Sequence, residues 1–501
     1  MAADLRTPRP APLLALAGAG TALLAVSSWW LAALPTGWTG PGPVGWLPRN
    51  GALAHLLSYL GLAALTAAWL LLGRVLVRTP GAVPVATVRR FVLAAATPLL
   101  GAAPFGRDLW AYAAQGNVLR HGFDPYSYGP AAIPGAFTDQ VSARWVASTS
   151  PYGPLWLRLS QAADWLSGSH PTLAALVLRL PAFGGLLLCL WAIPVLAQAL
   201  GGRASAGLWL GLASPLVVVL GIGGGHNDLL MLGLALAGLA VATRRGVPAL
   251  ATAAALTGLA VMVKSPAAIA LAFTVPVWVN ANGEAPALRR IVAASATAIA
   301  CAAAAVAVVT AVTGLGFGWT KQVNADAQWV SWLSLPSAVS MLAKAASGDA
   351  VKTVDGTLRT CRNVGEVLAV LVLVATWLLA VRARQRVAVL GWLAVALGAA
   401  ALLAPSVQPW YYAWGLAVAG LVPLGRRVLV LLTAAGLAFP VLITPSGYGY
   451  ESDWRALPIL AGALLVAAIA VGTVHSAPDD DRPDHAGAEV RADDGAEFGH
   501  I

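Results

Sequence analysis

The chain has 501 residues, of which 58% are hydrophobic and 10% are charged, and its mean hydropathy is +0.75. This composition excludes a soluble multi-domain protein and indicates a helical protein that crosses the membrane several times. The net charge of +10 is carried mostly by short loops between apolar runs, which indicates membrane topology rather than nucleic-acid binding.

About fourteen apolar runs reach or approach the length of a membrane span. Leu, Ala and Val fill them almost continuously, which predicts an all-α polytopic membrane protein with about 13–14 transmembrane helices. The first run is too long for the hydrophobic part of a signal peptide, so we expect it to remain as a helix. The runs lie near residues 11–34, 53–77, 88–105, 172–200, 205–222, 228–243, 247–263, 266–280, 290–313, 363–381, 387–404, 409–424, 428–444 and 456–474.

Basic residues predict which loops are cytoplasmic. If the N-terminus with Arg6 and Arg9 is cytoplasmic, every short basic loop falls on the same side, as the positive-inside rule requires. Two long polar or aromatic segments, 106–171 and 314–362, then face the extracytoplasmic side of the inner membrane and carry the candidate site.

This topology requires residues 152–166 not to cross the membrane. The segment is short and contains Arg158 and Asp164, so we expect it to lie along the interface as an amphipathic helix of the first large outer loop. A crossing there is the alternative, and it would be balanced by merging 247–280 into one span.

Residues 1–474 are predicted to form one transmembrane domain, followed by a tail, 475–501. The tail is acidic and rich in Pro, Gly and Ala, which predicts a disordered cytoplasmic segment. The three cysteines are widely spaced and predict neither a disulfide scaffold nor a zinc site. There is no P-loop or dinucleotide-binding glycine pattern, so a nucleotide site is unsupported.

The stretch RDLWAYAAQGNVLRHGFDPYSYGP begins where the third apolar run ends. Arg107 and Asp108 should therefore lie at the membrane surface. A carboxylate at a helix end in so apolar a chain is a functional candidate. A general base must come within hydrogen-bond reach of a hydroxyl, and partial burial raises a carboxyl pKa toward the working pH. The alternative is an Arg107–Asp108 pair that only anchors the helix end.

Five motifs together resemble a known superfamily. RDLWAYAAQG with HGFDPYSYGP, SPYGPLWLRL, GIGGGHNDLLMLGLALAG, AVMVKSPAAIAL and QPWYYAWGL follow one another between about residues 100 and 420. In this order they resemble the GT-C glycosyltransferases that use polyprenyl-phosphate sugars, and within them the MptB-type α-1,6-mannosyltransferases that use polyprenol phosphomannose.

The resemblance implies an inverting transfer of mannose from polyprenyl-phosphate mannose to the 6-hydroxyl of an α-mannan acceptor, as in a lipomannan or lipoarabinomannan core. Asp108 matches the acidic residue of the first catalytic loop and would accept the proton of the acceptor hydroxyl. Cations or hydrogen-bond donors would stabilise the departing phosphate. The candidates for that role are Arg107, His226, Lys264 and Lys321.

Substrate-binding roles are predicted for a further set of residues, several of which have a purely structural alternative. Asn227 and Asp228 are equally explained as a helix start, and Asp124 before Pro125 as a turn residue. Lys264 is alternatively a side chain that extends from a helix end to the interface. The predicted substrate-binding residues are Tyr112, Asp124, Tyr126, Tyr152, Asn227, Asp228, Gln408, Trp410 and Tyr411, the last three of which are alternatively an interfacial aromatic belt.

No cofactor is expected. The outer segments contain no Asp-x-Asp pair, and only Glu451 and Asp453 come near to one another in sequence, so a divalent metal is possible but not indicated. These two acids and Asp326 are interpreted as solvated loop residues. A lipid-linked-glycan flippase or transporter is the competing function, because it would also have many spans and embedded charges. A non-catalytic membrane scaffold that binds a lipid-linked glycan is the third.

Overall fold

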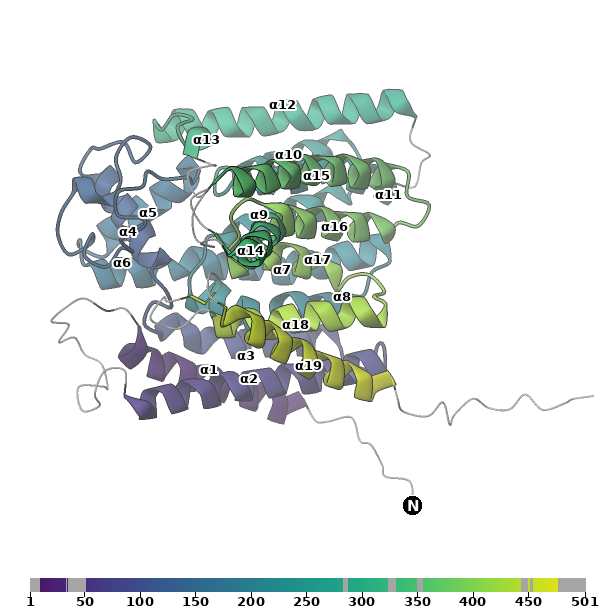
Figure 1. The fold of residues 1–501 in the computed structure, drawn as a ribbon. Coiled ribbons are helices and arrows are strands. Elements are labelled where there is room, and N and C mark those ends of the chain that lie inside the picture. Colours follow the sequence, from purple (N-terminus) through teal and green to yellow (C-terminus); the bar gives the residue numbers. More distant parts are fainter. Residues whose placement is uncertain are drawn as a thin grey trace, which may run out of the picture.

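The computed structural model describes residues 10–32, 34, 51–282, 287–322, 330–348, 355–442, 449–450 and 454–475. The long helices lie side by side in one bundle, and α4, α5 and α6 cluster at one end of it (Figure 1). This arrangement confirms the predicted all-α fold. Residues 476–501 of the predicted acidic tail and the acids Asp326, Glu451 and Asp453 lie outside the described residues.

The bounds of the helices follow the chain order. The first part comprises α1 Pro10–Leu31, α2 Ala52–Arg78, α3 Val85–Ala96, η1 Thr97–Gly101, α4 Asp108–Arg120, η2 Pro130–Ala132, α5 Pro154–Leu166, α6 Pro171–Val177, α7 Arg179–Leu200, α8 Ala204–Gly207, η3 Leu208–Leu212 and η4 Leu216–Gly223. The second comprises α9 Asp228–Ala242, α10 Val247–Val261, α11 Ala267–Ala281, α12 Leu288–Thr313, α13 Trp319–Gln322, α14 Leu335–Ser347, α15 Gly356–Val381, α16 Ala388–Leu403, η6 Pro409–Tyr411, α17 Tyr412–Ala419, α18 Arg426–Leu442 and α19 Ala456–His475.

Five described helices are long and apolar enough to cross a membrane: α1, α2, the continuous unit α6–α7, α12 and α15. A sixth span is possible if α8–η3 and η4, which meet at 56°, count as one. The protein is thus a multi-pass membrane protein. The thirteen to fourteen spans predicted from apolar runs are not reached by this criterion, in part because five further apolar helical stretches are only 10–17 residues long: α9, α10, α11, α16 and residues Ala456–Gly472 of α19.

The two ends of the bundle differ in charge. At one end the Arg203 backbone N–H donates to the Leu421 carbonyl at 2.8 Å, and Ser205 Oγ donates to the Val83 carbonyl at 2.8 Å. These contacts bring together the loops that follow α7, α17 and α2, at the end opposite α4–α6 (Figure 1). Arginines gather in or beside the loops of this end, including Arg78, Arg203, Arg244, Arg245, Arg382, Arg426 and Arg427.

A reciprocal tryptophan pair fixes the irregular helix η3. Trp69 of α2 stacks on Trp209 with 5.3 Å between ring centroids. Each indole N–H donates to the other residue's carbonyl at 2.9 Å, so both buried donors are satisfied. The pair therefore holds η3 against α2.

Helix α5, which covers the segment 152–166, packs tightly on α4. Gly116 lets the backbones approach, because a Cβ there would lie 2.2 Å from the Ser160 carbonyl oxygen. With 13 residues, α5 is too short to span a bilayer. Its polar residues are used inside the protein, since Arg158 donates to Gln161 and to the Thr313 carbonyl.

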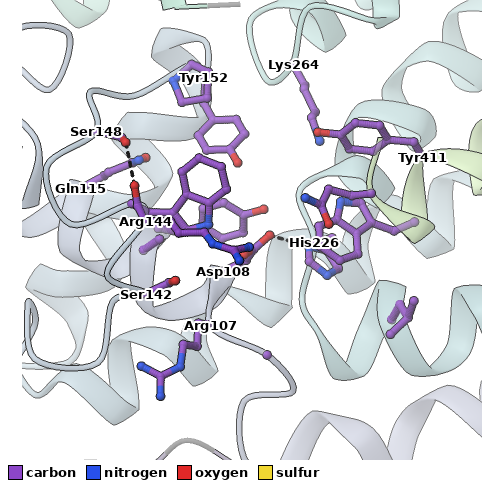
Figure 2. Close-up of a pocket in the computed structure, with 18 of the residues that line it drawn as sticks. Arg107, Asp108, Gln115, Ser142, Arg144, Ser148, Tyr152, His226, Lys264 and Tyr411 are labelled. Atoms are coloured by element: carbon purple, nitrogen blue, oxygen red, sulfur yellow. Dashed lines mark hydrogen bonds and ion pairs between the residues drawn. The ribbon is translucent and has the colours of Figure 1, made fainter. Parts of the chain in front are cut away.

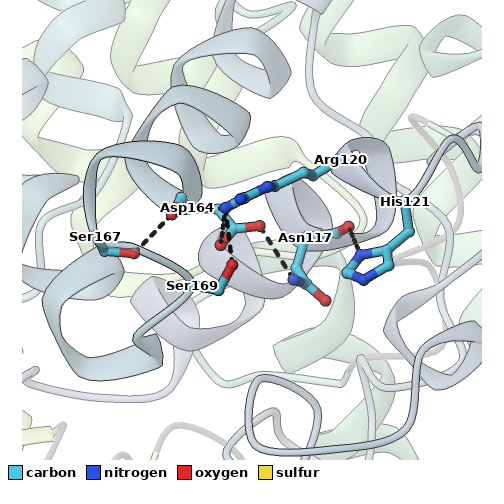
Figure 3. A network of polar contacts seen from close by, with 6 residues as sticks. All are labelled: Asn117, Arg120, His121, Asp164, Ser167 and Ser169. Atoms are coloured by element: carbon cyan, nitrogen blue, oxygen red, sulfur yellow. Dashed lines mark hydrogen bonds and ion pairs between the residues drawn. The ribbon is translucent and has the colours of Figure 1, made fainter.

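A buried polar network joins the far end of α4 to the end of α5 (Figure 3). Asp164 is fully buried and accepts a hydrogen bond from Asn117 Nδ2 at 3.0 Å and one from Arg120 Nη1 at 3.3 Å. The same Arg120 nitrogen donates to Ser169 Oγ at 2.8 Å. The charge of Asp164 is thus compensated internally, and α4 is anchored at the end opposite Asp108.

Candidate active site

A pocket with a cavity volume of about 120 Å³ opens at the α4–α6 end of the bundle, and Figure 2 shows residues that line it. Five separate parts of the chain meet in its wall: the start of α4, the loop before α5, the η4–α9 turn, the α10–α11 turn and η6. Its polar and aromatic lining includes Arg107, Asp108, Tyr112, Gln115, Ser142, Arg144, Trp145, Ser148, Tyr152, His226, Lys264, Gln408, Trp410 and Tyr411.

Asp108 is the first residue of α4. Gly106, two residues earlier, has φ +81°, a conformation that permits the sharp entry into the helix. A carboxylate at a helix N-terminus is favoured by the unsatisfied backbone N–H groups and the helix dipole. Its side chain is 23% exposed and lines the pocket, so the predicted base is accessible to a substrate hydroxyl.

His226 faces Asp108 from the η4–α9 turn. Its Nδ1 lies 3.5 Å from Asp108 Oδ2 (Figure 2), longer than an ordinary hydrogen bond. The imidazole stacks on Trp410 with 3.6 Å between centroids. Burial, and then the charge of Lys264, lower the pKa of His226 well below its usual value of 6.5. At neutral pH it is therefore an uncharged partner for Asp108, not a cation for a phosphate.

Lys264 lies in the turn between α10 and α11 and is held by a buried carboxylate. Its Nζ donates to Asp228 Oδ1 at 3.0 Å and to Oδ2 at 2.8 Å, and Trp414 Nε1 donates to Oδ1 at 2.8 Å. The ammonium also lies 4.4 Å from the centroid of the Tyr411 ring. Because both charges are almost buried, each requires the other. Lys264 lines the pocket, and Asp228 supports it from behind.

The two arginines of the pocket are placed differently. In Figure 2 the side chain of Arg107 points away from Asp108 and His226, although Arg107 is in the lining. Arg144 comes from the long loop between α4 and α5 and also lines the pocket. We did not predict Arg144, because nothing in its sequence neighbourhood separates it from an ordinary loop arginine.

Aromatic rings form one wall beside Asp108. Tyr112, one helical turn later on α4, meets Tyr152 and Trp156 edge to face, with 5.2 Å and 5.1 Å between centroids. Burial first, then the charges of Tyr152, Asp108 and Asp228, raise the pKa of Tyr112, so its phenol stays protonated. Such rings suit the apolar faces of sugars while leaving a polar edge.

The structure does not bring every predicted residue to the pocket. Neither Lys321 nor Tyr126 is in the pocket lining. Lys321 lies in α13 and is exposed. The Tyr126 hydroxyl donates a hydrogen bond to the Tyr152 carbonyl. Asp124 accepts hydrogen bonds from the Tyr126 N–H and Ser127 Oγ, which is the turn role weighed as its alternative. Asn227 is fully buried and is not in the pocket lining.

Gln115 also went unpredicted. It lies two turns beyond Asp108 on the same face of α4, lines the pocket, and accepts a hydrogen bond from Ser150 Oγ at 3.0 Å. Its spacing of seven residues from Asp108 could have predicted that both side chains lie on the same face of the helix. Within the described ranges, no three His, Cys, Asp or Glu side chains gather to form a metal-binding group.

The buried neutral His226 should make stability depend on pH. Below about pH 6.5 an unfolded histidine takes up a proton that the folded one does not, so stability falls as the pH falls, by at most about 1.4 kcal/mol per pH unit. We expect the melting temperature in detergent to decrease more between pH 7 and pH 5 for the wild type than for His226→Gln. Parallel pH curves for the two proteins would contradict this.

Two family models match the chain. One, described as "Alpha-(1->6)-mannopyranosyltransferase, N-terminal domain", covers residues 15–280, and the other, "MptB C-terminal domain", covers residues 336–473. The first contains Asp108, His226 and Lys264. The second contains Gln408 and, directly after it, η6 with Trp410 and Tyr411. The pocket is thus assembled from both matched regions.

Similar curated proteins carry the same description. The chain is 33% identical to alpha-(1->6)-mannopyranosyltransferase A of Mycobacterium tuberculosis over 83% of its own length and 80% of the relative. It is 30% identical to alpha-(1->6)-mannopyranosyltransferase A of Corynebacterium glutamicum, over 82% and 87%. It is 28% identical to alpha-(1->6)-mannopyranosyltransferase B of the same organism, over 79% and 69%. No solved structure matches the chain.

Proposed function

The chain belongs to the α-(1→6)-mannopyranosyltransferase family of the MptA and MptB enzymes, and from this premise we propose that its pocket transfers mannose from polyprenyl-phosphate mannose to the 6-hydroxyl of an α-mannan acceptor. The resemblance drawn from the motifs is confirmed. Membership of an enzyme family also favours catalysis over the flippase alternative. The acceptor would belong to a lipomannan or lipoarabinomannan core.

One observation carries this proposal. Asp108 is accessible in the pocket beside the neutral His226, and the cation Lys264 lines the same pocket. A base and a cation in one cavity are what a glycosyl transfer to a hydroxyl needs, because a proton leaves the acceptor while negative charge develops on the departing phosphate.

In the proposed reaction the acceptor O6 attacks C1 of the mannose as Asp108 takes the proton of that hydroxyl. The bond between C1 and the phosphate oxygen breaks, and its electron pair leaves with the polyprenyl phosphate. A single displacement converts the β-linked donor into an α-1,6 product. His226, whose Nδ1 lies 3.5 Å from the Asp108 carboxylate, helps to orient it, whereas Lys264 stabilises the phosphate.

The charge asymmetry of the bundle supports an extracytoplasmic pocket. The arginine-rich loops lie at the end opposite α4–α6, and the positive-inside rule places such loops in the cytoplasm. With an even number of passes, both termini and the acidic segment 475–501 would then be cytoplasmic. Residues 1–474 would form one catalytic domain in the inner membrane, with the polyprenyl tail of the donor in the bilayer.

Purified protein in detergent provides the direct test. Given polyprenyl-phosphate mannose and a soluble α-mannoside, it should lengthen the mannoside by one α-1,6-linked residue, with no second compartment present. Polyprenyl-phosphate glucose and arabinose serve as competing donors. Right-side-out vesicles with an impermeant acceptor should be active and inverted vesicles inactive. No transfer in detergent would overturn the proposed function, and activity only in inverted vesicles would overturn the orientation.

A further inference from the structure

Arg179, the first residue of α7, is completely buried. Burying a guanidinium without an acid is costly unless its N–H groups find other acceptors. Its hydrogen-bond partners in the described part of the chain are backbone carbonyl oxygens. Nε donates to the Gly223 carbonyl at 3.2 Å, and Nη2 donates to it at 2.8 Å. Nη2 also donates to the Ala103 carbonyl at 2.7 Å, and Nη1 to that of Ala102.

These carbonyls follow or end two short helices. Ala102 and Ala103 come directly after η1, and Gly223 is the last residue of η4. The last carbonyls of a helix lack intrahelical donors and form the negative end of its dipole. One planar guanidinium therefore satisfies acceptors at two helix ends that are far apart in the sequence, with a fork geometry that a lysine lacks.

The two backbone segments that Arg179 binds lie directly before Asp108 and before His226 in the sequence. Asp108 follows Ala103 by five residues, and His226 follows Gly223 by three. The two loops also touch each other, because the Phe105 N–H donates to the Gly223 carbonyl at 3.4 Å. A Cβ at Gly223 would lie 2.7 Å from the Phe105 ring, so the two loops are in direct contact and a larger residue than glycine would not fit between them.

We propose that Arg179 is a positioning residue that sets the separation of Asp108 and His226 by fastening the backbone before Asp108 to the backbone before His226. This inference rests on the proposed function of Asp108. Arg179 itself is not in the pocket lining and would not touch substrate. Its contribution is geometric, and misplacement of a reacting group by about 1 Å can lower a rate on the order of 100-fold.

The test compares Arg179→Lys with Arg158→Lys in the purified full-length protein. Arg158 is a matched control: it too donates to a backbone carbonyl, that of Thr313, but it is not in the pocket lining. For Arg179→Lys we expect kcat to fall roughly 10-fold to 100-fold while the KM for polyprenyl-phosphate mannose changes less than about threefold. Arg158→Lys should keep both constants near the wild-type values. Melting temperature and size-exclusion profile would establish how much of each variant is folded.

Three outcomes would overturn the positioning role. The first is a kcat for Arg179→Lys equal to that of Arg158→Lys. The second is a loss that matches the unfolded fraction alone. The third is a rise in donor KM with an unchanged kcat, which would indicate a donor-binding role instead. A wild-type protein that transfers no mannose would overturn the proposed function, whereas an active wild type with an equally active Arg179→Lys variant would overturn only this inference.

Discussion

Asp108→Asn and Asp108→Ala should both fold and bind the lipid donor yet transfer almost no mannose. Removing a general base lowers kcat by about 100-fold to 10,000-fold, and Asn keeps the size of the side chain without accepting a proton. Because Asp108 lies at the N-terminus of α4 and is partly exposed, the loss of its charge should cost little stability, about 1 kcal/mol or less. Steady-state kinetics with a soluble α-mannoside would measure the effect.

Asp139→Asn is the control for this loss. Asp139 lies in the same segment, residues 106–171, is exposed and is not in the pocket lining, so its variant should keep wild-type kcat. Donor binding by both Asp108 variants should be near normal, which separates a lost base from a lost site. Near-normal transfer by Asp108→Ala would show that the base has been misassigned and that Asp108 only anchors the start of α4.

Asp228→Ala should be the most destabilising single change at the pocket. It would leave the Lys264 ammonium almost buried without its carboxylate and remove the acceptor of Trp414 Nε1. Breaking one partner of a buried pair costs about 3–5 kcal/mol. We therefore expect a much lower melting temperature in detergent.

The double variant Asp228→Ala with Lys264→Met tests why Asp228→Ala loses stability. If an uncompensated charge is responsible, the double variant should melt at a higher temperature than Asp228→Ala alone, because replacing a buried pair by apolar groups is often neutral. Lys264→Met alone, by removing a cation from the pocket, should raise the KM for the donor. A double variant no more stable than Asp228→Ala would show that the Asp228 contacts to Trp414, rather than the charge pair, carry the stability.

The sequence by itself determined the fold class and the family, and it predicted a candidate site around Asp108. Apolar runs reveal membrane helices because hydropathy is a local property. Asp108 could be named as a candidate base because the end of an apolar run and a single acidic residue can be recognised within a few consecutive residues. Hydropathy also predicted that His226 and Lys264 lie in short turns between apolar runs. The structure brings both to the pocket with Asp108.

Only the tertiary structure decided what these residues do to one another. Asp228 is the first residue of α9, as the helix-start interpretation predicted, and it also binds Lys264, 36 residues further along the chain. Burial lowers the pKa of His226, and the fold places its ring 3.5 Å from the Asp108 carboxylate, a proximity that no local sequence signal indicated. The role of Arg179 depends on carbonyls 44 and 76 residues away. Charge pairing and desolvation depend on which segments pack together, and that information lies in no single stretch of sequence.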